Sequence, residues 1–301
     1  MMIGELAALG AAICWTVSAV LYKEALLKVK PISANIVRCV CTSIVLVVCL
    51  AIIGKFGVLT DLPLYAVILA SVSGIIGLGF GDTVYMVSLK LIGVARAVPI
   101  TCTYPLFNLL LAVFLQGEVV TLYVVLGTVA IVLGVWLISR EEKETGTSET
   151  QKKGLVRGVA SALATAILWA VSITMINMAV TLPETGSLDH ALAINTIRVS
   201  AVAVFLLASA PITDTKCSFL KMQRKTLITL ISGGIVALAL GWFFLTFSFI
   251  HTPESQAVPI SSTTPLFATV SGIIFLHEQV TAKDVVGSMI IVIGIFLIFT
   301  V

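Results

Sequence analysis

The chain consists mostly of apolar runs that are each about as long as a bilayer is thick, and this feature limits its fold more than any other. A helix needs about 20 apolar residues to cross the hydrocarbon core of a membrane. The mean hydropathy is +1.14, and 11% of the residues are charged, against 59% that are apolar or aromatic. An average soluble domain has about 25% charged residues. The sequence therefore indicates an integral membrane protein and argues against a soluble enzyme, a nucleic-acid-binding protein and a disordered chain.

The apolar runs predict ten membrane-spanning helices, separated by proline, glycine and charged residues. They lie near 4–22, 33–53, 64–89, 95–115 and 120–138 in the first half, and near 155–178, 190–210, 227–250, 255–276 and 282–300 in the second. The first run carries Glu5 and follows no basic segment, so we expect a retained span and not a cleaved signal peptide. The connections are too short for a soluble domain. The predicted fold is all-α.

The two halves carry the same residues at the same places, which indicates an internal duplication. Trp15 and Trp169 are spaced by 154 residues, and after an insertion in the second half Arg38 and Arg198 are spaced by 160. Further pairs at the 160-residue spacing are Gly81 and Gly241, Pro99 and Pro259, Pro105 and Pro265, Glu118 and Glu278, Gly127 and Gly287, and Gly134 and Gly294. Shared apolar bias alone does not align proline, glycine, glutamate and arginine together.

Each half contains an odd number of predicted spans, so the second half must cross the membrane in the opposite sense. We expect a first five-helix repeat at 1–139, a polar linker at 140–153 and a second five-helix repeat at 154–301. Inverted repeats of this kind occur in secondary transporters, where the substrate site lies near the middle of the membrane between the halves.

The duplicated motifs resemble those of the drug/metabolite transporter superfamily, in particular its EamA-type branch. The residues that carry the resemblance are Trp15 with Ser18, Trp169 with Ser172, Arg38 and Arg198, the AVPI and PLF segments of both halves, and Glu118 and Glu278. The resemblance implies two inverted five-helix repeats around a central cavity, with the fifth and tenth spans at the periphery. It also implies a secondary transporter of the plasma membrane that moves a small polar metabolite by alternating access and needs no cofactor, with export of an amino acid or a related compound favoured.

Other functions stay open at this point. A membrane-embedded enzyme or a lipid-handling protein is the alternative from another class, and the absence of a catalytic constellation argues against it. Within transport, a uniporter or exchanger competes with a proton-coupled carrier. The partners we expect are the substrate and the lipid bilayer, with no nucleic acid, and the residues leave open whether two copies form a homodimer.

Basic residues gather on one side of the predicted membrane. Most of the 18 lysines and arginines lie in the connections after spans one, three, five, seven and nine, whereas Lys55 alone lies in the connections on the other side. Basic loops favour the cytoplasm. The charge pattern therefore predicts both chain ends outside and the polar linker inside, although relatives in the superfamily are generally described with both ends in the cytoplasm.

Asp82 is the most unusual polar residue, because it lies within the third predicted span. A charged residue near the centre of a membrane helix costs about 2.5–3.5 kcal/mol on insertion scales, and such residues face a cavity or pair with a cation. The second half has Trp242 at this place, which argues against a symmetric structural role. We expect Asp82 to contact a substrate amine or to accept a proton, and the alternative is a buried pair with a cation such as Arg38, Lys90 or Arg96.

Arg38 and Arg198 occur in both halves near the starts of spans two and seven. Their symmetry favours a structural role, in which they cap helix ends or reach outward to the membrane interface. The alternative is contact with a carboxylate or phosphate of the substrate.

Polar and aromatic residues at helical spacing mark helix faces that lipid does not cover. The candidates for contact with a substrate or for coupling are Trp15, Ser18, Asp82, Tyr85, Tyr104, Asn108, Trp169, Ser172, Trp242 and Thr264. Pro105 and Pro265 lie within spans four and nine and predict local breaks there.

Three features have an ordinary explanation. The run 77–81 resembles a phosphate-binding loop, but it lies inside an apolar span and is better explained by close helix packing. His277 and Glu278 suggest a metal site, yet adjacent residues point apart and no third ligand is near. Glu118 matches Glu278, so a role at a helix end or in a loop is expected for both. We find no catalytic, metal-binding or nucleotide-binding motif.

Overall fold

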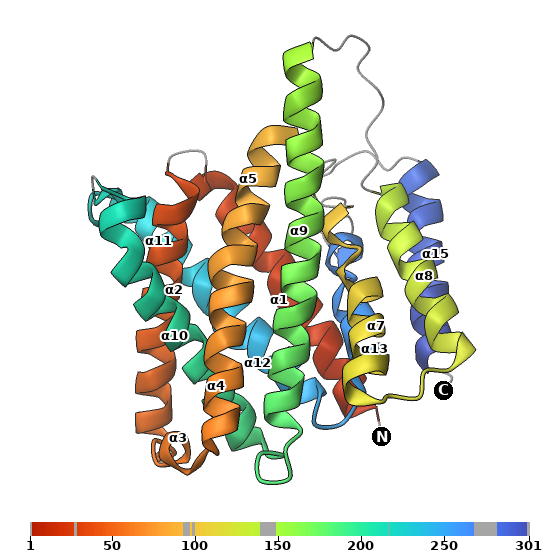
Figure 1. Cartoon of the computed structure of the whole chain (residues 1–301), viewed down its shortest axis with the longest axis horizontal. Helices are drawn as coiled ribbons and strands as arrows, with labels where there is room; N and C mark the ends of the chain where they lie inside the picture. The colour runs from red at the N-terminus through yellow and green to blue at the C-terminus, as the bar shows by residue number, and fades with distance from the viewer. Residues whose placement is uncertain are drawn as a thin grey trace.

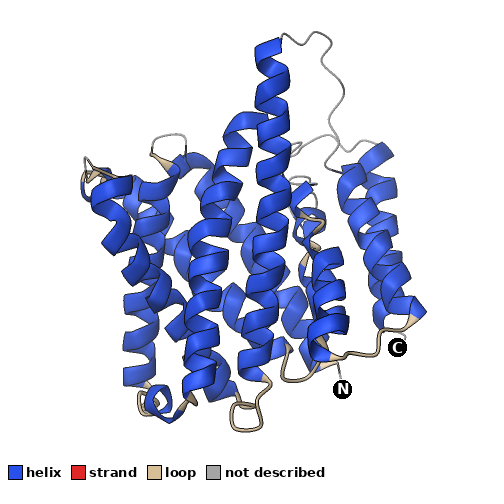
Figure 2. Cartoon of the chain, viewed as in Figure 1, coloured by secondary structure: helices blue, strands red, loops and turns tan. Residues whose placement is uncertain are grey.

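The computed structural model describes residues 2–26, 29–92, 97, 100–138, 149–215, 217–267 and 282–299. Within these segments every regular element is a helix, and no β-strand is present (Figure 1, Figure 2). The structure therefore confirms the all-α fold that the hydropathy pattern predicts.

The helices follow the predicted apolar runs. Those of the first half are α1 (Ile3–Leu26), α2 (Pro31–Ile52), α3 (Val58–Asp61), α4 (Leu64–Ser73), the π-helical η1 (Gly74–Gly81), α5 (Asp82–Ile92), α7 (Tyr104–Gln116) and α8 (Leu122–Ile138). Those of the second half are α9 (Glu149–Val180), α10 (Leu188–Thr213), the short 3₁₀ helix η2 (Ser218–Leu220), α11 (Arg224–Gly234), the π-helical η3 (Ile235–Gly241), α12 (Trp242–Ser248), α13 (Glu254–Ser261) and α15 (Ala282–Phe299).

Five helical stretches are long and apolar enough to cross a membrane. They are Pro31–Ile52, Leu64–Ser88, Gly154–Val180, Leu188–Thr213 and Arg224–Ser248, and shorter apolar helices cover Ile3–Ser18, Tyr104–Gln116, Leu122–Leu137 and Val285–Ile298. Large apolar side chains also point outward, since Phe114 is 79% exposed and Phe296 is 69% exposed. Water disfavours an apolar surface of this extent and lipid does not. The chain is a multi-pass membrane protein.

A π-helical segment interrupts one long helix in each half at the same place. The helix of α4 continues through η1 into α5, and that of α11 continues through η3 into α12. A side chain at Gly81 would place its Cβ 2.9 Å from the Trp169 ring, and one at Gly241 would place it 2.7 Å from Trp15 Nε1. These glycines therefore let η1 approach α9 and let η3 approach α1. The glycine-rich run packs closely against a neighbouring helix, as we expected.

Local breaks precede Pro105 and Pro265, as the prolines predict. Turn residues 102–103 precede α7, and turn residues 262–263 follow α13. Proline lacks an N–H and disfavours the helical conformation in the residue before it. Backbone carbonyls near the breaks accept hydrogen bonds from side chains three residues later: Thr103 Oγ1 donates to Ile100 O at 2.6 Å, and Thr263 Oγ1 donates to Ile260 O at 2.7 Å.

Helices α1 and α9 run in opposite directions, and so do α8 and α15 (Figure 1). Helix α1 begins at the end of the bundle where α9 finishes, and α8 begins at the end where α15 finishes. The α8–α15 pair stands at the edge of the bundle, and α1 packs against η3 and α12 while α9 packs against η1 and α5. The first helix of each half thus contacts the π-helical segment of the other half.

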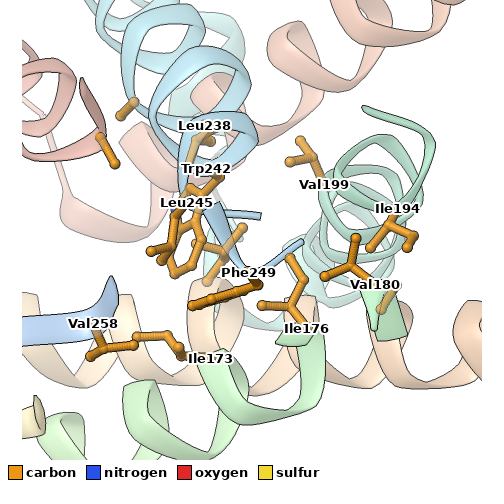
Figure 3. Close-up of a cluster of buried hydrophobic side chains, with 14 of the residues drawn as sticks. Ile173, Ile176, Val180, Ile194, Val199, Leu238, Trp242, Leu245, Phe249 and Val258 are labelled. Carbon is orange, nitrogen blue, oxygen red and sulfur yellow. The ribbon is translucent and has the colours of Figure 1, made fainter. Parts of the chain in front are cut away.

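A buried apolar core joins the helices of both halves. Figure 3 shows its part in the second half, where α9, α10, η3 and α12 contribute Ile173, Ile176, Ile194, Leu238 and Leu245, each at most 2% exposed. The same cluster continues into α1, α2, η1 and α8 of the first half. The core therefore fixes the central helices from which the polar side chains described below project.

One boundary differs from its prediction. We expected a solvated linker over 140–153, but α9 begins at Glu149, so the last residues of this stretch are helical. Glutamate, glutamine and lysine are good helix formers, and the apolar run that follows continues the same helix. Residues 139–148 lie outside the described part of the chain.

We predict that Gly127→Ala lowers the melting temperature by several degrees in detergent. A Cβ at Gly127 would lie 2.7 Å from Gly294 O, which is closer than van der Waals contact allows, so α8 and α15 must separate. The control is Gly154→Ala in α9, where a Cβ meets nothing within 4 Å and alanine favours the helix. Equal melting temperatures for the two variants would contradict this packing.

Candidate functional site

Arg38 and Asp82 form a buried ion pair where α2 passes the start of α5. Arg38 is 6% exposed, and its Nη2 atom pairs with Asp82 Oδ2. The Arg38 Nε atom donates to Asn35 Oδ1 at 2.8 Å, and the guanidinium lies 5.4 Å from the centroid of the Tyr22 ring. Trp169 Nε1 donates to the second carboxylate oxygen of Asp82 at 3.0 Å. Asp82 thereby joins α2 and α5 of the first half to α9 of the second.

Arg198 on α10 has different partners. It is 0% exposed, and it donates from Nε to Ser73 Oγ and from Nη2 to Ser172 Oγ, each at 3.0 Å. Its guanidinium carbon lies 3.5 Å from the centroid of the Trp242 ring. The Nη1 atom is buried without a hydrogen-bond partner among the described residues, and none of their carboxylates forms an ion pair with Arg198. Arg198 thus contacts neutral hydroxyls and an aromatic face.

The two arginines occupy equivalent places. Trp242 contacts Arg198 as Asp82 contacts Arg38, and both partners follow their arginine by the same number of residues. The two halves therefore place the same cation at the same position and differ in the group that faces it.

Two asparagines bind the π-helical segments in the same symmetric way. Asn35 Nδ2 donates to Leu78 O in η1, and Asn195 Nδ2 donates to Leu238 O in η3, both at 2.9 Å. This pair is not among the residues predicted from the sequence. The signal was present, because the two asparagines share the 160-residue spacing and each lies three residues before its arginine.

Aromatic candidates surround the two arginines. The Trp15 and Trp242 rings meet edge to face with centroids 5.2 Å apart. The Trp169 ring lies 5.1 Å from Tyr85 and 6.1 Å from Tyr104. Trp15, Tyr85 and Trp169 are only half-buried. We call Arg38, Asp82, Trp169, Arg198, Trp242, Ser73 and Ser172 the central polar site.

Three of the predicted candidates lie elsewhere. Ser18 Oγ donates to Trp15 O within its own helix, at 2.9 Å. Thr264 faces α1, where Thr16 Oγ1 donates to Thr264 O at 3.1 Å. Asn108 belongs to the second cluster, described below.

The expectation for the structural role of the arginines was wrong in its detail. Neither Arg38 nor Arg198 reaches the membrane interface or caps a helix end, because both side chains are buried against helices of the bundle. Contrary to our expectation, Trp242 does not exclude a symmetric role for Asp82, since both residues contact the arginine of their own half. Arg38, one of the cations considered for Asp82, pairs with it, whereas Arg96 lies outside the described residues.

A second polar cluster, which was not predicted from the sequence, surrounds Glu254. Glu254 is 0% exposed, and its carboxylate accepts hydrogen bonds from Asn108 Nδ2 at 2.6 Å, Thr174 Oγ1 at 2.5 Å, Asn177 Nδ2 at 3.0 Å and Gln116 Nε2. These donors come from α7 and α9, which finish near the end of the bundle where α13 begins (Figure 1). Glu254 looked like a loop residue because it follows Pro253 between two apolar runs. We call this group the Glu254 cluster.

Glu118 caps the helix that carries Glu254, which confirms its predicted role at a helix end. Its carboxylate accepts the backbone N–H groups of Glu254 at 2.9 Å and of Ser255 at 3.1 Å. A carboxylate at a helix N-terminus satisfies free donors and opposes the positive end of the helix dipole. His277 and Glu278 lie outside the described residues. Among those described, no three histidine, cysteine, aspartate or glutamate side chains gather as ligands for a metal.

Comparison with known proteins gives a family match over nearly the whole chain. The model of the EamA-like transporter family matches twice, at residues 2–140 and at 156–300. An uncharacterized transporter of Archaeoglobus fulgidus is 26% identical over 99% of this chain and 98% of its own length. A Listeria innocua protein provisionally named for sugar uptake is 26% identical over 78% of this chain and 80% of its own.

A solved crystal structure has the same fold. It superposes with a TM-score of 0.77 over 99% of this chain and 97% of its own, at 17% sequence identity. At this identity the likeness concerns the fold alone.

We predict that Asp82→Asn and Arg38→Gln each lower the melting temperature, because each leaves a buried charge or dipole without its partner. Breaking a buried ion pair from one side costs roughly 3–5 kcal/mol. The double variant should recover part of the loss. The control is the exposed pair Lys55–Asp189, where Lys55→Gln should cost about 0–1 kcal/mol. Strictly additive losses at Arg38 and Asp82 would show that the pair is not coupled.

For the Glu254 cluster we expect Glu254→Ala to destabilise the protein more than Glu254→Gln does. Alanine removes an acceptor that four side chains share and leaves Thr174 Oγ1 and Gln116 Nε2 without one, at roughly 1–3 kcal/mol for each buried group, whereas glutamine keeps one acceptor oxygen. Glu184, which is exposed, supplies the control Glu184→Ala. Thermal unfolding in detergent measures all three, and an unchanged melting temperature for Glu254→Ala would contradict the cluster.

Proposed function

Because this chain belongs to the EamA-like transporter family, we propose that it is a secondary transporter that moves a small polar metabolite across the plasma membrane by alternating access. Membership of the family shows that the protein is a membrane transporter. What we propose is its mechanism, the direction of transport and the class of its substrate. The observation that carries the mechanism is the set of matched contacts that join each half to the other.

Two inverted five-helix repeats, giving ten spans, account for these contacts. The family model matches the chain twice, α1 and α9 run in opposite directions (Figure 1), and Asn35 and Asn195 make the same hydrogen bond at 2.9 Å. Transporters built from inverted repeats exchange two conformations by moving one repeat against the other around a fixed site. The repeats would span 1–139 and 154–301, and the central polar site lies where they meet.

The two polar clusters support a division of roles. The central polar site joins α2, α4 and α5 of the first half to α9, α10 and α12 of the second, whereas the Glu254 cluster joins α7, α9 and α13 near one end of the bundle (Figure 1). In alternating access one end closes while the other opens. We assign the Glu254 cluster to closure of the end where α1 begins, and the central polar site to the substrate.

Asp82 fits the buried-pair alternative better than the role of isolated proton acceptor, because Arg38 and Trp169 occupy both carboxylate oxygens. A uniporter or exchanger is therefore favoured over a carrier in which Asp82 takes up protons. Amino acid export, which the resemblance favours, and sugar uptake, after which the Listeria innocua relative is provisionally named, are both candidate activities.

Counterflow into proteoliposomes tests the proposal. We expect a labelled amino acid, sugar or organic anion to accumulate in vesicles preloaded with the same unlabelled solute, without ATP, and with rates that saturate. Protein-free vesicles are the control, and Arg38→Gln protein should be inactive while Lys55→Gln protein is active. An absolute requirement for ATP would contradict secondary transport.

We predict that the polar linker faces the cytoplasm. The lone basic residue of the opposite end, Lys55, pairs with Asp189 at 2.6 Å, which increases the charge difference between the two ends. In a background with Cys49→Ser and Cys217→Ser, a membrane-impermeant maleimide added to intact cells should label Gly57→Cys and spare Ser148→Cys. The reverse labelling would invert the orientation.

A further inference from the structure

The central polar site contains one more positive charge than negative charge. Arg38 is paired with Asp82, but Arg198 contacts two serine hydroxyls and the Trp242 ring, all of them neutral. The other carboxylates that are buried among the described residues have donors of their own: Asn108, Thr174, Asn177 and Gln116 donate to Glu254, and Ser33 Oγ and the Phe219 N–H donate to Asp214. No described group therefore neutralises Arg198.

An unpaired charge at this depth is costly. Removing an ion from water costs several kcal/mol even after the protein relaxes, and Arg198 is 0% exposed in a membrane protein. Stacking on an aromatic face returns only about 2 kcal/mol when the cation is desolvated. Charged groups kept inside membrane proteins mark the paths of substrates and ions.

The Arg198 guanidinium also has a hydrogen-bond donor that no described group accepts. Nη1 is buried without a partner, while Ser73 and Ser172 hold Nε and Nη2 at 3.0 Å and so fix the plane of the group. A planar guanidinium matches the two oxygens of a carboxylate or phosphate. Trp242, which covers the cation, stands where the first half has Asp82, so the second half lacks the internal acid that neutralises Arg38.

We propose that Arg198 binds a substrate with a net negative charge, a carboxylate or a phosphate, and that this anion supplies the missing counter-charge. The inference rests on the proposed transport function and narrows its substrate class. A neutral sugar or a zwitterion leaves the charge of Arg198 in place, whereas an acidic amino acid or a sugar phosphate removes it. Because Arg198 is fully buried, the anion reaches it only when Trp242 moves, so binding is coupled to opening of the site.

Thermal unfolding with small probes tests this assignment. Purified protein in detergent with phosphatidylcholine is melted in the presence of acetate, inorganic phosphate or acetamide, the neutral isostere of acetate, at equal ionic strength. We expect acetate or phosphate to raise the melting temperature by several degrees over acetamide. The rise should persist in Lys55→Gln and disappear in Arg198→Gln. Without any probe, Arg198→Gln should melt no lower than the unaltered protein, because it removes an unpaired charge.

Each other result overturns the assignment. If neither anion exceeds acetamide, or if the rise survives in Arg198→Gln, Arg198 is not the anion site. A lower melting temperature for probe-free Arg198→Gln shows a structural cation. If only phosphatidylglycerol in nanodiscs stabilises the protein through Arg198, the ligand is a lipid headgroup and not a substrate.

The outcome is separable from that of the proposed function. If a neutral solute shows counterflow but no anion raises the melting temperature, the protein is a transporter and Arg198 is not an anion site. If anions stabilise the protein through Arg198 but labelled glutamate or phosphate does not enter proteoliposomes, Arg198 is an anion site and the proposed transport function fails.

Discussion

Two guanidinium groups, buried in a bundle that holds few other charges, set the arrangement of the helices around them. Arg38 needs Asp82 from α5, and Asp82 in turn takes a hydrogen bond from Trp169 on α9. Arg198 needs Ser73 from α4 and Ser172 from α9. Because a buried charge is tolerated only where donors and acceptors surround it, these helices must meet at one place, and they meet across the boundary between the halves.

Small residues and π-helical turns make this meeting possible. Gly81 lets the indole ring of Trp169 lie directly against η1, and Gly241 lets that of Trp15 lie against η3, so each ring contacts the segment of the opposite half. π-helical segments in helices are frequent at functional sites, and here one precedes each residue that faces an arginine. The symmetry of the backbone is therefore close, while the chemistry at Asp82 and Trp242 is not. Because of this asymmetry, Arg38 and Asp82 together carry no net charge, whereas Arg198 and Trp242 together carry one positive charge.

The sequence predicts the positions of the helices well and the polar clusters only in part. Apolar runs mark the helices because lipid and core both require them, and the 160-residue spacing identifies Arg38, Arg198, Asp82 and Trp242 as related positions. The spacing does not reveal contacts. That Arg198 has no acid partner among the described residues depends on how α10 faces η1 and α9, and no local pattern encodes that packing. Glu254 was missed because its donors lie on helices far away in sequence.

The central claim is that Arg198 carries an uncompensated charge, and a matched pair of variants measures this most directly. Trp242→Asp and Trp242→Asn remove the same ring and leave the same space, so they differ only in whether position 242 supplies a negative charge. The account predicts that, in ligand-free protein, the aspartate variant melts several degrees above the asparagine variant. An aspartate variant that melts at the same temperature or lower would show that Arg198 is already neutralised and would contradict the account.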